Sequence, residues 1–281
     1  MVPASTSSRY RRPRPEPDGP ALISMASVPT PDGYLRRRHP GGDAVTWAAA
    51  ADWAEGVLEN DTLHGWASRQ SDRVDFPGRG QVHSVPAPLP GPESRMRWAV
   101  RHYCRGGAMA MHMEDRYMRG GTPRPFREIA AIEASRARGI RTPAPVAGAT
   151  YVQNVSYRCD LVTEAVPDVR TLADLLHDHD GTRGWLRSMA RAGDLIRLLG
   201  EAGVYHVDLN ARNILLSDDH GEPAWVVDLD RARVLDGPST RAAERMELRL
   251  VRSIVKIGTP TGEHLGDQEV MRALATRNSE L

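Results

Sequence analysis

The sequence predicts an α+β protein with two lobes, a small β-rich lobe followed by a mostly helical lobe. Two observations favour this fold class. Up to about residue 164, the sequence shows several short apolar runs bounded by Gly and Pro, which are typical of strands, and one helical pattern. Beyond that point, most segments carry apolar residues three or four positions apart, as one face of a helix does. The 281 residues and an apolar share of 40% are sufficient for one two-lobed domain with a sizeable core.

The chain is expected to start with a disordered leader over residues 1–44. This part is rich in Pro, Arg, Ser and Gly, as in "SSRYRRPRPEPDGP", and such a composition buries too little apolar surface to fold. Order is therefore expected to begin near residue 45, at "VTWAAAADWAEGVL". No apolar stretch reaches the length that a membrane-spanning helix needs.

Residues 45–164 are predicted to form the first lobe. A Gly-rich turn between two strands is expected in "DFPGRGQVHSV", and the segments "RMRWAVRHY" and "YRCDLVTEAV" are expected to be strands. The apolar spacing of "RPFREIAAIEASRARG" predicts a helix that ends at Gly139. The join to the second lobe is placed between Glu164 and Pro167.

Residues 165–281 are predicted to form the second lobe. Its expected helices are "TLADLLHDH", "GWLRSMARAGDLIRLLGEAG" and "STRAAERMELRLVRSIVKI". The stretch "VYHVDLNARNILLSDDHGEPAWVVDLDRARV" lies between the last two of these helices. Its apolar runs "NILL" and "AWVV" flank a series of turn-forming residues, which predicts an antiparallel pair of strands.

The ends of this strand pair carry residues suited to phosphate chemistry. Asn213 and Asp228 lie symmetrically about the turn at residues 220 and 221, so they are expected to lie side by side. Asp208 is just upstream, and Asp230 points to the same side of its strand as Asp228. Amide and carboxylate oxygens suit Mg²⁺ and a bound phosphate better than a protein core. The spacing therefore predicts a metal-assisted phosphoryl-transfer site, with Asp230 as a helper for a second metal or as support for the loop.

These motifs resemble the catalytic elements of the protein-kinase fold. His206, Asp208 and Asn213 match its catalytic loop, and Asp228 matches its metal-binding aspartate. More narrowly, the chain resembles the bacterial lipopolysaccharide kinases of 3-deoxy-D-manno-octulosonic acid (Kdo) over roughly residues 55–256. The segments that carry this resemblance, in chain order, are "GRG", "VRHYCRGG", "DRYMRGGTPRPFRE", "TPAPVA", "YRCDLVTE", "HVDLNARNIL" and "VVDLDRAR".

The resemblance implies ATP as the phosphate donor, with roles for residues of the first lobe. Gly78 and Gly80 would belong to the loop that covers the nucleotide. Arg101 would replace the strand lysine of protein kinases at the α- and β-phosphates, and Glu128 would be its partner on the helix. Arginine keeps the charge and can bind phosphate through two N–H groups, so this departure is compatible with activity.

In the second lobe, the resemblance implies that Asp208 is the catalytic base and that Asn213 and Asp228 hold Mg²⁺. The segment "VVDLDRA" departs from the Asp-Phe-Gly motif of protein kinases and lacks its glycine. An activation-loop switch is therefore not expected. The short segment after Asp230 also leaves little room for a platform that binds a peptide.

The implied acceptor is the 4-hydroxyl of Kdo on a lipid A precursor, at the cytoplasmic face of the inner membrane. The net charge of +1 gives no electrostatic case for nucleic acid. A basic stripe on the last predicted helix is either a solvated face or a contact with anionic lipid or the acidic glycolipid. Its members are Arg241, Arg245, Arg249, Arg252 and Lys256.

Every candidate residue also has a structural alternative. Asp208 could cap a turn, and Gly78 and Gly80 could form an ordinary turn. Glu128 could be a solvated charge on its helix. His206 is expected to hold the catalytic loop against the core rather than to take part in the reaction.

Two other functions remain open. One is a kinase of another substrate, such as an antibiotic or choline-type phosphotransferase or an atypical protein kinase. The segments "VRHYCRGG" and "DRYMRGG" favour the lipopolysaccharide group over these enzymes. The other is a non-catalytic, nucleotide-binding pseudokinase, which the intact set of Asp208, Asn213 and Asp228 disfavours.

Overall fold

The computed structural model describes residues 28–76, 82–104, 115–178, 182–219, 221–257 and 266–278. The expected Gly-rich turn with Gly78 and Gly80 lies outside the described residues. The two strands that flank it, β3 (Val74–Asp75) and β4 (Val82–Pro86), pair in antiparallel register.

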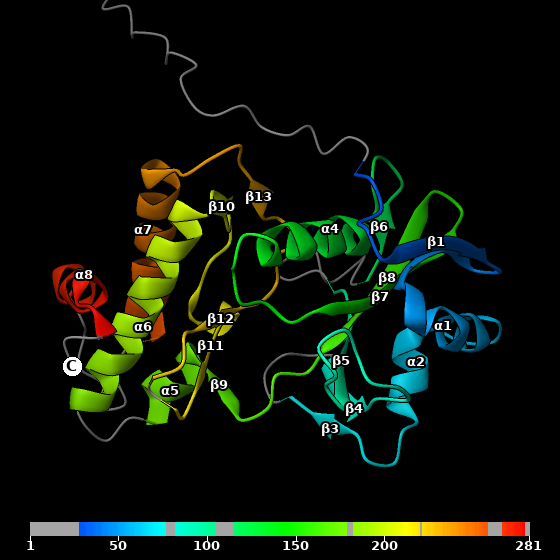
Figure 1. Cartoon of the computed structure of the whole chain (residues 1–281), viewed down its shortest axis with the longest axis horizontal. Helices are drawn as coiled ribbons and strands as arrows, with labels where there is room; N and C mark the ends of the chain where they lie inside the picture. The colour runs from blue at the N-terminus through cyan, green and yellow to red at the C-terminus, as the bar shows by residue number, and fades with distance from the viewer. Residues whose placement is uncertain are drawn as a thin grey trace, which may run out of the picture.

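One antiparallel sheet organises the first lobe, by which we mean β1 to β8 with α1, α2 and α4 (Figure 1). Its strands follow the order β1-β2-β7-β8-β5-β4-β3, and β6 pairs with β8. The predicted strands at "RMRWAVRHY" and "YRCDLVTEAV" are present as β5 and β8 and pair with each other. The remaining bounds are β1 Tyr34–His39, β2 Gly42–Trp47, β5 Arg97–His102, β6 Tyr117–Met118, β7 Pro145–Gln153 and β8 Ser156–Glu164.

The expected boundary of the leader at residue 44 is wrong. Strands β1 and β2 form a hairpin that starts at Tyr34, inside that range, and β2 joins the sheet beside β7. The arginines of "YLRRRH" lie on an exposed edge strand, where charged side chains are favourable, whereas Ala44 and Val45 of β2 are buried. The average composition of the segment concealed these strands, because an edge strand needs few apolar residues.

Alternate residues of β5 face opposite sides of the sheet. Trp98 and Val100 pack with α1 (Ala51–Leu58) and α2 (Leu63–Ser68) in one buried cluster. Arg101 and Tyr103 lie on the other side, where both contact Glu128 of α4 (Arg124–Arg136). This alternation follows from the two-residue period of a strand. It places Arg101 beside α4 and not in the core under α2.

Close approach between α4 and the sheet depends on Gly148 of β7. A Cβ atom there would lie 2.9 Å from Ile129 Cδ1 and 3.0 Å from Pro125 Cβ. Glycine removes this clash and lets the buried face of α4 lie directly on the sheet. The predicted helix is therefore present, and it brings Glu128 to the edge of the second lobe. The expectation of a single helix in the first lobe is wrong, because α1 and α2 belong to this lobe as well.

The second lobe is mostly helical, and its helices lie together on the left of Figure 1. The three predicted helices are present, and α8 is an additional helix that the sequence pattern did not indicate. A Cβ atom at Gly193 of α6 would lie 1.9 Å from the Leu274 carbonyl oxygen, so glycine permits α6 and α8 to touch. The bounds are α5 Leu172–Asp178, α6 Thr182–Glu201, α7 Thr240–Ile257 and α8 Asp267–Ala275.

Two small sheets position the polar loops of the second lobe. Strand β9 (Val169–Thr171) pairs with β11 (Ile214–Ser217), which also pairs with β12 (Trp225–Val226). Strand β10 (Val204–Tyr205) pairs with β13 (Arg233–Val234). Since β8 belongs to the first sheet and β9 to the second lobe, we propose that the lobes join between them. The α+β fold class with a β-rich and a helical lobe is confirmed.

Candidate active site

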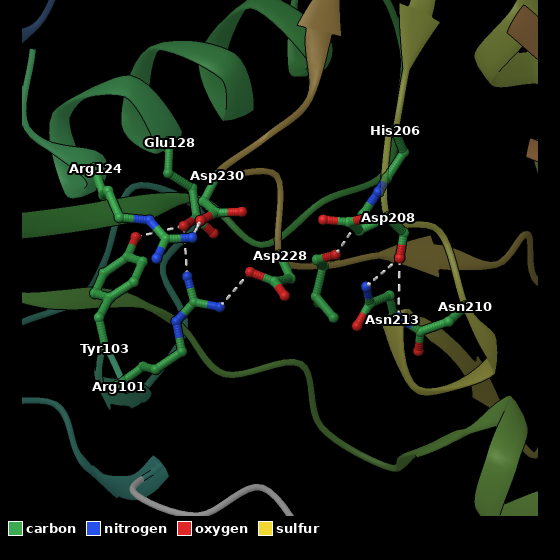
Figure 2. A network of polar contacts seen from close by, with 11 residues as sticks. Arg101, Tyr103, Arg124, Glu128, His206, Asp208, Asn210, Asn213, Asp228 and Asp230 are labelled. Atoms are coloured by element: carbon green, nitrogen blue, oxygen red, sulfur yellow. Dashed lines mark hydrogen bonds and ion pairs between the residues drawn. The ribbon is translucent and has the colours of Figure 1, made fainter. Parts of the chain in front are cut away.

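A buried histidine anchors the loop between β10 and β11. The His206 side chain is 1% exposed, and its Nε2 donates a 3.1 Å hydrogen bond to the Val227 carbonyl oxygen. Burial lowers the pKa of His206 below its ordinary value, which favours the neutral ring. Figure 2 shows this contact tying the loop to the backbone beside Asp228. These contacts agree with the structural role that the sequence suggested for His206.

Two asparagines hold the backbone at Asp208. The side-chain nitrogens of Asn210 and Asn213 donate to the Asp208 carbonyl oxygen, at 2.9 and 3.3 Å (Figure 2). The side-chain oxygen of Asn210 accepts from the backbone N–H of Arg212 at 2.9 Å, which caps the short turn Ala211–Asn213. The position of Asp208 is therefore fixed through its main chain, and its carboxylate is left to make other contacts.

The carboxylate of Asp208 lies between two arginines that the sequence did not indicate as site residues. Arg231 Nη1 is 2.6 Å from Oδ2, and Arg249 Nη2 is 2.7 Å from Oδ1. Arg231 directly follows Asp230, and Arg249 belongs to the basic stripe of α7. No local pattern links either arginine to Asp208, because the contacts depend on how α7 packs against the loop.

The predicted strand pair is present, but its register differs by one residue from the prediction. Ile214 pairs with Val226, and the next N–H along the ladder, from Val227, donates to the Asn213 carbonyl oxygen at 3.0 Å. Asn213 is therefore opposite Val227, and the expected direct pairing of Asn213 with Asp228 is wrong. The prediction assumed strand pairing that is symmetric about the midpoint between residues 220 and 221, whereas the observed pairs are symmetric about residue 220.

Asp228 has a left-handed backbone conformation, with φ at +67°. Such a conformation is unfavourable for a residue with a side chain, and it turns Asp228 out of the line of β12. Its side chain points toward Arg101, whose Nη1 donates a 2.8 Å hydrogen bond to Oδ1 (Figure 2). Burial acts to raise the pKa of Asp228, but the charge and hydrogen bond of Arg101 outweigh it and lower the pKa below its ordinary value.

The predicted ion pair between Arg101 and Glu128 is present. Arg101 Nη2 lies 2.5 Å from Glu128 Oε2. The Tyr103 hydroxyl also donates a hydrogen bond to this oxygen. Glu128 is 1% exposed, so it is not the solvated charge of the alternative interpretation. Burial raises the pKa of Glu128 although Arg101 acts against it. Burial acts to lower the pKa of Arg101, but the charges of Glu128 and Asp228 outweigh it and raise this pKa above its ordinary value. Arg101 also stacks on the Tyr103 ring, 4.5 Å from its centre.

Asp230 takes part in a different contact from Asp228. Its carboxylate forms an ion pair with Arg124 at the start of α4, and the residue is 8% exposed. Arg124 in turn lies over the rings of Tyr103 and Tyr117, at 5.6 and 4.7 Å from their centres. This arrangement links the segment after Asp228 to the first lobe. The ion pair with Arg124 supports the alternative that Asp230 stabilises the loop. A metal-binding role for Asp230 stays a prediction.

The donor set at this site fits a magnesium ion that arrives with a nucleotide. The side-chain nitrogen of Asn213 is engaged with the Asp208 carbonyl, which leaves its amide oxygen to accept or to bind a cation. Asp228 offers its second carboxylate oxygen, since Arg101 contacts only Oδ1. Within the part of the chain that the structure describes, no three His, Cys, Asp or Glu residues could hold a metal by themselves. Mg²⁺ is commonly bound by one or two protein groups plus substrate phosphates, and this site offers that number.

Comparisons with known proteins identify relatives of the chain. The model of the lipopolysaccharide kinase (Kdo/WaaP) family matches residues 65–269. A 3-deoxy-D-manno-octulosonic acid kinase of Xanthomonas oryzae pv. oryzae (strain PXO99A) is 36% identical over 201 residues, which cover 70% of this chain and 75% of the relative. The same-named enzyme of Stenotrophomonas maltophilia (strain K279a) is 33% identical over 195 residues, 68% of this chain and 72% of the relative. A solved structure of WaaP in complex with acyl carrier protein aligns over 88% of this chain and 91% of that chain, with 16% identity and a TM-score of 0.47.

Proposed function

Since the chain belongs to the lipopolysaccharide kinase (Kdo/WaaP) family, we propose that it transfers the γ-phosphate of ATP to the 4-hydroxyl of Kdo on a lipid A precursor. The chain is an ATP-dependent kinase of lipopolysaccharide core biosynthesis. The relatives named as Kdo kinases support a sugar hydroxyl as the acceptor. The finer assignment to the 4-hydroxyl is part of the proposal.

Asp208 is the proposed base of this reaction. In phosphoryl transfer, the protein has to position the attacking hydroxyl and to stabilise charge on the phosphates. The hydrogen bonds from Asn210 and Asn213 to the Asp208 carbonyl oxygen hold its backbone and so restrict the position of its carboxylate. From that place the carboxylate accepts a hydrogen bond from the acceptor hydroxyl and takes its proton during transfer.

Arg101 is the proposed cation at the α- and β-phosphates. It is 24% exposed, is held by Glu128, and points at Asp228, on the side of the sheet that faces the second lobe. Gly78 and Gly80 are proposed to lie over the nucleotide. Asn213 and Asp228 are proposed to hold Mg²⁺, which would neutralise charge on the phosphates when bound with ATP.

The single observation that carries this proposal is the Arg101–Asp228 contact. It brings a cation of the first lobe to the expected metal ligand, which follows the His206-x-Asp208 loop in the second lobe. A pseudokinase has no need for this combination of cation, carboxylates and amide. A kinase of another acceptor would use the same groups, so only a test of acceptors separates that alternative.

We also propose peripheral contact with the anionic inner-membrane surface at the cytoplasmic side. Among the described residues, no helix is long and apolar enough to cross a bilayer. The basic residues of the stripe on α7 are exposed, and Met246, Leu250 and Ile254 on its other side are buried against the second lobe. A glycolipid acceptor that is embedded in the membrane requires such an approach.

The decisive experiment measures transfer of radiolabel from [γ-³²P]ATP. Kdo-lipid A precursor is the test acceptor, and a protein mixture and an aminoglycoside are controls. We expect labelled glycolipid, and NMR of the product should locate the phosphate on the 4-hydroxyl. Transfer to the aminoglycoside or protein in place of the glycolipid would establish the alternative phosphotransferase. ATP binding without transfer to any acceptor would establish the pseudokinase.

A further inference from the structure

The side chain of Asp208 is contacted from two sides by arginines of different elements. Arg231 follows the Asp228 segment, and Arg249 belongs to α7. The arginine side chains are 59% and 51% exposed, whereas that of Asp208 is 30% exposed. Each guanidinium reaches one carboxylate oxygen through a single nitrogen, at 2.6 and 2.7 Å.

Support of the loop does not explain these two arginines. The backbone of Asp208 is already held by Asn210 and Asn213, and His206 anchors the start of the loop. Ion pairs between long, exposed side chains and a carboxylate contribute little to folding stability. We therefore look for the role of these two arginines in binding the acceptor.

The charges at this place favour an anionic acceptor. One carboxylate and two guanidinium groups sum to a local charge of +1. An acceptor hydroxyl that hydrogen-bonds to Asp208 has to enter within about 3 Å of the carboxylate, and it thus comes beside both arginines. A neutral sugar leaves the extra positive charge uncompensated, whereas a sugar with one carboxylate neutralises it. Each guanidinium has five N–H donors, so each can hold Asp208 and a second carboxylate together.

We propose that Arg231 and Arg249 form the binding site for the carboxylate of the acidic sugar acceptor. They grip this carboxylate while the reacting hydroxyl of the same sugar lies at Asp208. The two arginines thereby select an acidic sugar over a neutral one, and they position it rather than take part in the proton transfer. This inference rests on the proposed function and adds to it the residues that determine acceptor specificity.

The test compares two acceptors that differ in one group. One is the Kdo-lipid A precursor, and the other is the same glycolipid with the sugar carboxylate converted to a carboxamide. The lipid phosphates are identical in both, so the ratio of the two kcat/KM values reports on the sugar carboxylate alone. We expect the unaltered protein to prefer the acid by about 10- to 100-fold, the range for hydrogen bonds to a charged group.

Substitutions then identify the side chains that bind the sugar carboxylate. Arg231→Gln and Arg249→Gln should each reduce the preference for the acid several-fold, chiefly through KM for the acid. Any change in how Asp208 itself acts affects both acceptors alike and cancels in the ratio. Arg233→Gln is the matched control, because Arg233 is an exposed arginine two residues after Arg231 in β13. It should keep the full preference.

Three outcomes would overturn the inference. The unaltered protein could use the acid and the amide equally well, a comparison that needs no folded variant. The glutamine variants could keep both the full preference and the full activity, which would leave the arginines without a role in acceptor binding. The variants could lose activity equally on both glycolipids, which would restrict the arginines to supporting Asp208 or to binding a lipid phosphate. In all three cases transfer to the glycolipid persists and the proposed function stands, whereas no transfer by the unaltered protein would refute the proposed function itself.

Discussion

Arg101 on β5 donates a 2.8 Å hydrogen bond to Asp228, a residue 127 positions later in the chain. The same guanidinium is paired with Glu128 of α4. One arginine thus connects the sheet, the helix that packs on it and the polar segment of the second lobe. The contact also places a positive charge beside the residue that we propose as a metal ligand.

The charge of Arg101 should matter more than the shape of its side chain. Arg101→Lys should retain part of the activity, with kcat/KM about 10-fold lower, because the charge remains and one of the two hydrogen bonds is lost. Arg101→Met removes the charge and should lower kcat/KM much further, mainly through weaker ATP binding. Steady-state kinetics with varied ATP measure both effects. An Arg101→Met variant with unchanged KM for ATP would exclude Arg101 from the phosphate site.

Asp208→Asn should slow the reaction and leave nucleotide binding intact. The amide keeps the size of the side chain but accepts no proton, so we expect kcat to fall roughly 10²–10⁴-fold. Calorimetry should give an unchanged affinity for ATP with Mg²⁺, since Asp208 is not among the proposed nucleotide contacts. Near-normal turnover in a folded variant would remove Asp208 from the mechanism.

Asp228 and Asp230 should differ in their effect on metal binding. Asp228→Ala should abolish the part of ATP affinity that depends on Mg²⁺, because the metal loses its carboxylate ligand. Asp230→Ala removes the partner of Arg124 and should mainly lower the melting temperature. Calorimetry of ATP binding with and without Mg²⁺ distinguishes the two variants. Equal loss of Mg²⁺ dependence in both would establish Asp230 as a metal ligand as well.

The stability contributed by His102 should depend on pH. Burial acts to lower the pKa of His102, but the hydrogen bond and charge of Asp160, together with Asp115, outweigh it and raise the pKa above 6.5. The Nδ1 of His102 lies 2.6 Å from Asp160 Oδ1, and the His64 ring is 5.5 Å away. A raised pKa means that the charged pair stabilises the fold fully below pH 6.5 and loses this contribution as the pH rises through the folded-state pKa.

His102→Asn should therefore lower the melting temperature more at pH 6 than at pH 9. We expect a difference of about 2–4 °C, equivalent to about 1 kcal/mol in a chain of this size. Thermal denaturation of the variant and the unaltered protein across this pH range measures it. A variant whose deficit is the same at every pH would show that the charge on His102 is irrelevant to stability.

The basic stripe should bind the membrane mainly through the residues that lie away from the active site. Arg249 contacts Asp208, so a test of the stripe should leave it unchanged. Replacing Arg241, Arg245 and Arg252 by Gln should weaken binding to anionic vesicles, at about 1 kcal/mol for each cation. Binding of the unaltered protein should also weaken as salt rises, since exposed charges are screened beyond about 8–10 Å.

Co-sedimentation with anionic and zwitterionic vesicles measures this binding, and turnover of a soluble, truncated Kdo acceptor serves as the control. Turnover should change little, because none of the three residues contacts Asp208 in the described structure. Equal sedimentation of the variant and the unaltered protein would reduce the stripe to a solvated face.

The sequence by itself determined the features that depend on neighbours along the chain. The apolar spacing around Ile129 predicted α4, and the turn-forming residues before Ala224 predicted the β11–β12 pair. The spacing of His206, Asp208 and Asn213 indicated the catalytic loop and, through a family resemblance, the pairing of Arg101 with Glu128. Periodicity and turn chemistry act over a few residues, so one sequence is enough to reveal them.

Only the tertiary structure decided the contacts that neither a local pattern nor the family resemblance had predicted. The left-handed backbone of Asp228 and the register of β11 on β12 separated Asn213 from the partner that symmetry had assigned to it. The docking of α7 brought Arg249 to Asp208, and the pairing of β2 with β7 turned part of the expected leader into sheet. Contacts of long charged side chains and of edge strands depend on how distant elements pack, and no local pattern of residues encodes that packing.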